Sequence, residues 1–100
     1  MAVRVEMDLS PAFHKAFPSR SFTLEIPDEK ASLWNLLRHL ASEAGREGER
    51  LLFVKGKEEI LPGLMVMVND RTFTGVELNG KDVLLQDGDR ISLLYFVSGG

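Results

Sequence analysis

The most distinctive chemistry in this chain lies at its C-terminus, where Ser98, Gly99 and Gly100 follow a strand-like segment. An α-carboxyl group, with a pKa of about 3.5, is ionised at neutral pH, so it is a poor electrophile but a usable nucleophile toward the α-phosphate of ATP. Glycine has no Cβ and adopts almost any φ, which lets the backbone enter a narrow channel. Extended residues 97–100 span roughly 13 to 14 Å. The pattern predicts a carboxylate that reacts inside another protein; a frayed end or a cloning remnant is the alternative.

No other group of residues forms a recognisable reactive site. The chain has no cysteine, which excludes thiol nucleophiles, thiolate metal sites and disulfides. His14 and His39 have no second ligand at metal spacing and are expected on the surface. Asp87 and Asp89 resemble part of a calcium loop, but the rest of that pattern is missing, so a turn is expected. We therefore predict no metal site and no catalysis by the isolated chain.

Composition narrows the class of protein. The 100 residues carry 12 basic and 15 acidic side chains, and the basic ones are scattered without a run of three, which argues against a nucleic-acid partner. No apolar run approaches the roughly 18 residues of a membrane span, and no signal peptide is recognisable. We expect a cytoplasmic protein with one domain over residues 1–97 and a flexible tail over residues 98–100.

Hydrophobic periodicity predicts the elements that position this terminus. Alternation predicts strands over residues 2–8 and 21–26. The continuously apolar residues 64–68 and the segments 71–74 and 90–97 are also predicted as strands, with turns at 69–70, 79–80 and 87–88. One helix is expected from an N-cap at Ser32 to a left-handed Gly45. Residues 46–62 have no clear pattern, and 51–54 could be a strand or a helical turn. The order favours an α+β fold of the β-grasp type, with the first and last strands parallel at the centre of a mixed sheet, although other α+β arrangements also satisfy the pattern.

Three segments resemble the sulfur-carrier family of ubiquitin-like proteins: residues 61–70 (LPGLMVMVND), 85–91 (LQDGDRI) and 97–100 (VSGG). The resemblance is nearest to the small subunit of molybdopterin synthase (MoaD) and to the ubiquitin-related modifier. It is more distant to the thiamine-pathway carrier ThiS, which lacks an equivalent of residues 46–63. The Asp-Gly-Asp turn and the Gly-Gly end are the most diagnostic parts, and residues 1–60 match in layout only. Phe73 stands in a segment where the ubiquitin-related modifier usually shows a tryptophan, which counts against that assignment.

The resemblance implies a function for the terminus. An adenylating enzyme of the MoeB/ThiF type would use ATP to activate Gly100, next to Gly99, and sulfur would then displace AMP to leave a thiocarboxylate. The acceptor would be a partner such as the large subunit of molybdopterin synthase, in molybdenum cofactor biosynthesis. The chain itself would bind no cofactor and act as a carrier or a non-catalytic subunit. The alternatives are a modifier conjugated to lysines, a carrier for tRNA thiolation, or a plain ubiquitin-like interaction module.

The residue parity of two strands predicts where partners dock. If Ile91 and Leu93 point toward the helix, then Leu94 and Phe96 point to the opposite sheet face. By the same rule Val66 and Val68 point inward, which leaves Met65 and Met67 outside. With Ser98 beside them, these four outward side chains are expected to form a docking patch for partners. The alternative is that residues 9–20 or 46–63 fold over them. Trp34, at the edge of the helix's apolar stripe, is expected to serve packing.

Overall fold

The computed structural model describes residues 2–14, 16–17, 20–54 and 59–95. Its strands are β1 (Ala2–Leu9), β2 (Ser21–Pro27), β3 (Leu64–Val68), β4 (Arg71–Thr74) and β5 (Arg90–Tyr95). Its helices are α1 (Leu33–Leu52) and the short α2 (Gly75–Leu78), and 3₁₀ turns occupy Pro11–Phe13 and Asp28–Lys30. Each of the five predicted strands is present, and the described part of β5 ends at Tyr95.

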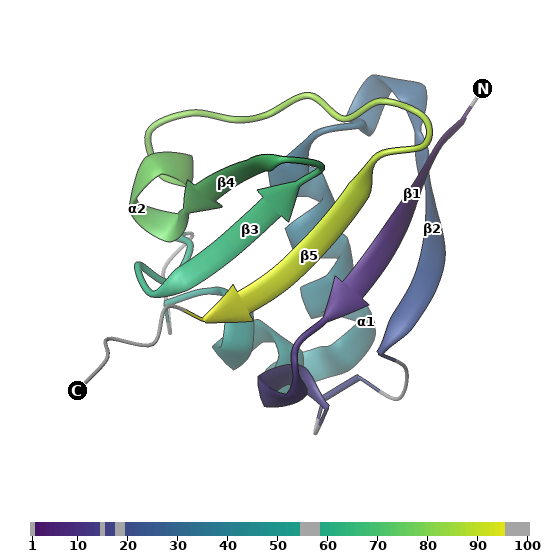
Figure 1. Cartoon of the computed structure of the whole chain (residues 1–100). Helices are drawn as coiled ribbons and strands as arrows, with labels where there is room; N and C mark the ends of the chain where they lie inside the picture. The colour runs from purple at the N-terminus through teal and green to yellow at the C-terminus, as the bar shows by residue number, and fades with distance from the viewer. Residues whose placement is uncertain (1, 15, 18–19, 55–58, 96–100) are drawn as a thin grey trace.

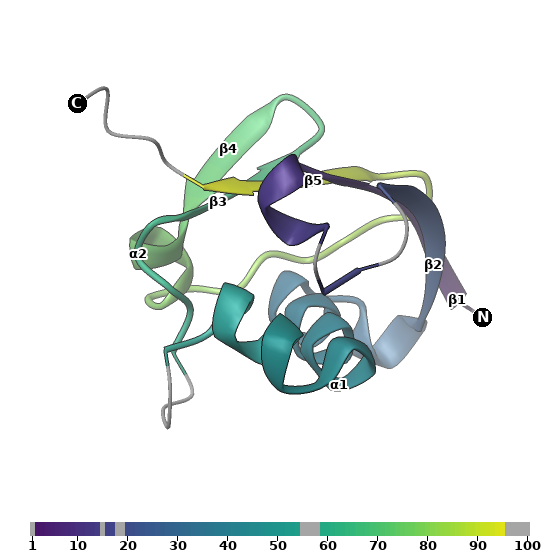
Figure 2. The same cartoon turned by 90° about the horizontal axis from the view of Figure 1, so that it is seen from below.

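The strands form one mixed sheet in the order β2-β1-β5-β3-β4, with α1 across one face (Figures 1 and 2). β1 and β5 are parallel neighbours, and the other strand pairs are antiparallel. The core lies between the sheet and α1, and Val5, Leu36 and Ile91 are completely buried there. The predicted α+β fold of the β-grasp type is confirmed, including the central parallel pair.

Helix α1 begins where the sequence predicts and extends further than expected. The Ser32 hydroxyl accepts a hydrogen bond from the Asn35 amide at 3.3 Å, as an N-cap does. Gly45 has the expected positive φ of 70°, but it kinks the helix instead of ending it. Helical structure resumes to Leu52, whose side chain is completely buried. The sequence did not predict this second helical segment, because residues 46–50 are polar and the buried Leu52 comes only at the end of the segment.

Residues 51–54 combine both alternatives left open by the sequence. The helix ends at Leu52, and Phe53 then forms an isolated antiparallel bridge with Ile60. The side-chain amide of Asn79 holds the far side of this segment, since it accepts from the Ile60 amide at 2.8 Å and donates to the Ile60 carbonyl at 2.9 Å. Asn79, at the predicted turn, therefore also holds the segment before β3 in place through these two hydrogen bonds.

The short helix α2 was not predicted. Its N-terminus is a capping box, in which Thr74 Oγ1 accepts from the Glu77 amide and Glu77 Oε1 accepts from the Thr74 amide. The helix starts at Gly75, where a Cβ atom would lie 1.8 Å from the Leu61 carbonyl oxygen. Four residues are too few to produce a helical period, but the Thr-x-x-Glu spacing was visible in the sequence.

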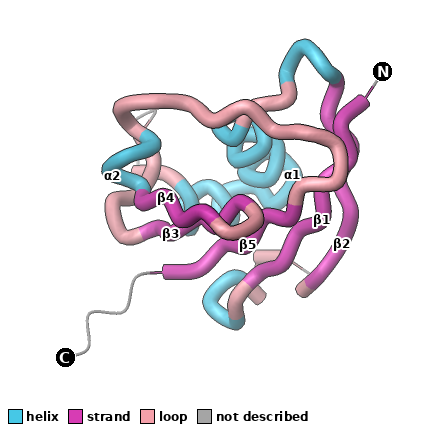
Figure 3. Tube along the Cα trace, turned by 45° about the horizontal axis from the view of Figure 1, so that its top comes forward, coloured by secondary structure: helices cyan, strands magenta, loops and turns pink. Residues whose placement is uncertain are grey.

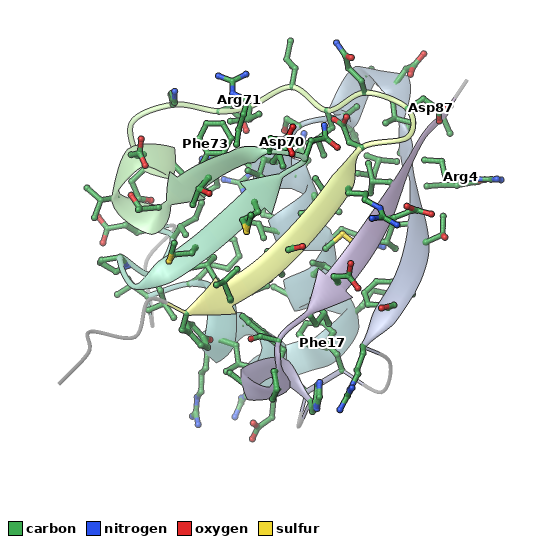
Figure 4. The ribbon with its side chains drawn as sticks, in the orientation of Figure 1. Arg4, Phe17, Asp70, Arg71, Phe73 and Asp87 are labelled. Atoms are coloured by element: carbon green, nitrogen blue, oxygen red, sulfur yellow. The ribbon has the colours of Figure 1, made fainter. Side chains whose placement is uncertain are left out.

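The Asp-Gly-Asp turn ties the start of β5 to β1. The predicted turn is present: Gly88 has a φ of 89°, which favours glycine, and its amide donates to the Arg4 carbonyl at 2.7 Å. Asp87 Oδ1 accepts from the Arg4 amide at 2.9 Å, and Figure 4 places these two residues together where β1 begins. Asp89 accepts from the Gln86 amide at 2.8 Å and from the Asn69 side chain at 2.9 Å. The motif thus connects β1, the β3–β4 turn and the start of β5 by hydrogen bonds.

Candidate docking face and C-terminal strand

The residue parity predicted for the two central strands is confirmed. Ile91, Leu93 and Val66 are buried at 1% exposure or less. The residues between them, Met65, Met67 and Leu94, lie on the face of the sheet away from α1 and are partly buried. Met65 stands directly opposite Leu94 in the β3–β5 register, so the two side chains are cross-strand neighbours.

These three side chains, here called the outer patch, do not pack against the hydrophobic core cluster. The described parts of residues 9–20 and 46–63, which were the alternative cover for this face, direct their buried apolar side chains to the α1 side of the sheet. Phe13 is completely buried and stacks on Tyr95 with a centroid distance of 4.9 Å, and Leu52 is completely buried in the core. Each side chain of the outer patch is partly exposed, which makes the patch a candidate contact surface for a partner.

A charged zone borders the outer patch on the same sheet face, over β1 and β2. Arg4 pairs with Glu25 at 3.0 Å, and Arg90 pairs with Glu6 at 3.1 Å. The hydrogen bond with Glu25 raises the pKa of Arg4 above its ordinary value. Each of these arginines is neutralised by a neighbouring strand's carboxylate. A partner that docks on the outer patch thus meets an apolar centre beside a zone of internally paired charge.

Tyr95 anchors the described end of β5, and the sequence analysis missed it. Its hydroxyl donates a hydrogen bond to the Leu51 carbonyl of α1. Burial raises the pKa of the Tyr95 phenol to about 12. Tyr95 has the same parity as Leu93, which was the available signal that it faces α1. This contact fixes the position from which the chain continues toward its C-terminus.

The other predicted site residues, Phe96, Ser98, Gly99 and Gly100, lie outside the described residues. Their roles remain predictions from the sequence.

The contacts of Trp34 and Phe73 indicate that both aromatic side chains stabilise the fold. Trp34 Nε1 donates to the Leu78 carbonyl at 2.7 Å, so Trp34 joins α1 to α2 and serves packing as expected. Phe73 is 5% exposed, and the Arg71 guanidinium lies over its ring at 5.5 Å (Figure 4). The Lys81 ammonium lies over the same ring at 5.3 Å. Within the part of the chain described here, no group of three or more acidic or histidine side chains is arranged to hold a metal ion. None of the helices formed by these residues has the length and apolar character needed to cross a membrane.

The sheet order, the single long helix and the central parallel strand pair define a ubiquitin-like protein with a β-grasp fold. The chain is 26% identical to the Haloferax volcanii HVO 2177 protein, with a TM-score of 0.75 over 99% of this chain and 88% of that one. SAMP1 from Haloferax volcanii is 22% identical, with a TM-score of 0.73 over 97% and 99% of the two chains. A putative molybdopterin converting factor, subunit 1, from Pyrococcus furiosus is 19% identical, with a TM-score of 0.66 over 95% and 99%.

The family model described as Urm1 (ubiquitin related modifier) matches residues 4–100. The chain belongs to this family of ubiquitin-like sulfur carriers and modifiers. The resemblance to the ubiquitin-related modifier is confirmed, and Phe73, the departure noted from that family's pattern, does not exclude the chain from it. A comparison with curated proteins gave no match.

Proposed function

We propose that this protein carries sulfur on the carboxyl group of Gly100. A carboxylate oxygen attacks the α-phosphate of ATP in a partner enzyme and releases pyrophosphate, which forms an acyl adenylate. Sulfide from a donor then attacks the acyl carbon, AMP leaves, and the terminus becomes a thiocarboxylate. The observation that carries this proposal is the family match, because it extends through Gly99 and Gly100. ATP belongs to the activating enzyme, and the chain supplies the carboxylate.

The outer patch is the docking surface in this proposal. The same face must bind an adenylating enzyme of the MoeB/ThiF type and afterwards a sulfur acceptor. Unbranched methionine side chains adapt to differently shaped surfaces, which suits Met65 and Met67 to two partners in turn. In this proposal Phe96 would extend the patch from Leu94 toward the C-terminus, and Ser98 would enter the enzyme's channel with the two glycines. The parity of Leu94 on the outer face supports this assignment.

The acceptor reaction we favour is delivery to the molybdopterin precursor through the large subunit of molybdopterin synthase. The chain would then be the non-catalytic small subunit of that enzyme. The resemblance of residues 61–70 and 85–91 to MoaD supports this choice, as does the fold shared with the Pyrococcus furiosus protein. Reconstitution tests it directly: the thiocarboxylated chain, the large subunit and the precursor should yield molybdopterin. A chain that is thiocarboxylated but inactive in this reaction would exclude this acceptor.

A second candidate function is protein modification, which the family's description as a ubiquitin related modifier favours. In that case a substrate lysine attacks the activated glycine and forms an isopeptide bond. Mass spectrometry on material from the native cell separates the candidates. Replacement of one oxygen by sulfur at Gly100 indicates a carrier, whereas Gly-Gly remnants on lysines of other proteins indicate a modifier. Finding neither would leave a plain interaction module.

The activation step has its own test. With a purified adenylating enzyme and ATP, deletion of Gly100 or the substitution Gly99→Ala should abolish or strongly reduce ATP–pyrophosphate exchange. Neither change should alter the thermal unfolding midpoint, since both sites lie beyond the core strands. Normal exchange by the truncated chain would refute the carrier proposal.

A further inference from the structure

Strand β5 is held on both sides up to its last described residue, Tyr95. On the β3 side, Tyr95 stands opposite Leu64 in the antiparallel register. On the other side, the Ser10 amide, just after β1, donates to the Leu93 carbonyl at 3.0 Å. Figure 3 shows β5 between β1 and β3, with its described end at the side of the sheet from which the chain leads to the C-terminus. The sheet therefore fixes the path of the chain as far as residue 95.

The Tyr95 side chain adds contacts with two elements outside the sheet. Its ring stacks on Phe13, with a centroid distance of 4.9 Å and an interplanar angle of 14°. Phe13 is completely buried in the 3₁₀ turn that follows β1. The Tyr95 hydroxyl donates to the Leu51 carbonyl in the last turn of α1. The side chain thus joins the end of β5 to the 3₁₀ turn and to the end of α1.

The Leu51 carbonyl is a fixed attachment point for this hydroxyl. The carbonyl groups in the last turn of a helix have no partner within the helix. The neighbouring Leu52 carbonyl accepts from the Leu61 amide at 3.0 Å, and the Leu52 side chain is completely buried. The end of α1 is therefore held in place independently of Tyr95. Loss of the Tyr95 hydroxyl would remove the bond between this end and β5.

The position of Tyr95 limits how far the terminus can reach. Measured from Tyr95, residues 96–100 span roughly 17 to 18 Å when extended. A reactive group on a short tether from a fixed point has a high effective concentration at a site within that reach. Separation of β5 from its neighbours would lengthen the tether and lower this concentration. The outer patch lies on the other face of the sheet, so its contacts do not require the Tyr95 hydroxyl.

We infer that Tyr95 is a positioning residue for the activation of Gly100, because its contacts with Leu51 and Phe13 fix the point from which the terminus reaches the partner's active site. This inference rests on the proposed function. In this role Tyr95 does not contact ATP or the reacting carboxylate, and it acts through the backbone of β5. It should therefore affect the rate constant of adenylation, kcat, more than the chain concentration that half-saturates the enzyme, KM.

ATP–pyrophosphate exchange by a purified adenylating enzyme of the MoeB/ThiF type measures both constants when the concentration of the full chain is varied. Tyr95→Phe keeps the ring and removes the hydroxyl, so it should lower kcat roughly fivefold and change KM by less than roughly twofold. Tyr95→Leu also removes the stack and should lower kcat further, roughly 20-fold. Leu94→Ala, in the outer patch, should show the opposite pattern, with a raised KM and little change in kcat.

Ser32→Ala is the control for lost stability. Ser32 caps the opposite end of α1, where its hydroxyl accepts from the Asn35 amide at 3.3 Å. Ser32→Ala and Tyr95→Phe each remove one hydrogen bond, so both should lower the unfolding midpoint by roughly 5 °C. At a temperature where both variants are folded, Ser32→Ala should leave kcat and KM unchanged.

The possible outcomes separate this inference from the proposed function. Normal kcat in Tyr95→Phe, or an equal loss of kcat in Ser32→Ala, would overturn the inference and leave the carrier proposal standing. A rise in KM alone in Tyr95→Phe would also overturn it, because Tyr95 would then act in docking. If the unaltered chain is not adenylated, the proposed function fails, and this inference fails with it.

Discussion

Two adjacent leucines of β5 offer a sharp test of the proposed docking face. Leu93 is 1% exposed and packs in the core, whereas Leu94 is partly buried on the outer face opposite Met65. The substitutions Leu93→Ala and Leu94→Ala remove the same atoms from neighbouring positions in one strand. Any difference between the two variants therefore reports the face on which each side chain lies.

The structure sets the size of the expected effects. Truncation of a fully buried leucine costs about 3 kcal/mol, because the lost transfer energy is joined by the cost of a cavity. Leu94 lies outside the core cluster, so its truncation should cost about 1 kcal/mol. A domain of this size unfolds with an entropy of about 0.2 kcal/mol/K, so Leu93→Ala should lower the unfolding midpoint by about 14 °C and Leu94→Ala by about 5 °C.

Binding should reverse this order. Truncation of a central interface side chain costs about 1 to 2 kcal/mol, so Leu94→Ala should weaken the complex with the adenylating enzyme roughly 5- to 30-fold. Leu93→Ala should bind normally at a temperature where it remains folded. Differential scanning calorimetry and titration calorimetry measure the two effects separately. Loss of binding in Leu93→Ala alone, or greater destabilisation by Leu94→Ala, would refute the assignment of the outer patch.

Three further predictions follow from local geometry. Gly75→Ala should lower the free energy of unfolding by about 2 kcal/mol or more, because the new Cβ would overlap the Leu61 carbonyl. Gly63 has open space around it, so the control Gly63→Ala should change the free energy of unfolding by less than about 0.5 kcal/mol. Equal effects of the two substitutions in chemical denaturation would contradict the contact at Gly75. Gly88→Val should lower the free energy of unfolding by about 1 to 2 kcal/mol, because valine is strained at the positive φ of this position. Adenylation of the chain should fall only as far as the substitution unfolds it. A large loss of adenylation in a folded variant would place this turn at an interface. Tyr95 is the one tyrosine, so tyrosinate absorbance should titrate near pH 12 in the folded chain, compared with about 10 when unfolded. Since folding raises this pKa, the contribution of the neutral phenol to stability is fully present below about pH 10 and is lost as the pH rises through about 12. Tyr95→Phe should lack that loss, and a midpoint near 10 in the folded chain would show that the phenol is not buried.

Strand periodicity and turn residues were sufficient to predict most of this fold. Alternation located β1 and β2, and a continuous apolar run located β3. Residue parity then assigned the faces of β3 and β5, because successive side chains of a strand point to opposite faces of the sheet. Gly45 and Gly88 were recognisable because a left-handed backbone position favours glycine. The outer patch followed from the same parity.

The features that the sequence did not reveal depend on contacts between distant segments. The helical residues after Gly45 are stabilised by the burial of Leu52, which the polar stretch before it conceals. The bond between Tyr95 and Leu51 joins positions 44 residues apart, and no local pattern predicts it. A groove between β2 and α1 could not be predicted from the sequence either, because its lining residues come mainly from a strand and a helix that meet only in the folded chain.

The position of β5 has a consequence for synthesis. β5, the last strand in the described part of the chain, lies between β1 and β3, so the β1–β2 and β3–β4 hairpins cannot join into one sheet until β5 has left the ribosome. The hydrogen bonds that hold the start of β5 against β1 join residues more than 80 positions apart, as between Arg4 and Asp87 or between Glu6 and Arg90. Folding dominated by such distant contacts comes late, after most of the chain is made. A prematurely terminated chain would thus lack both the terminus that we propose to be activated and the folded surface. An activating enzyme that must bind the folded surface first would not use ATP on such a chain.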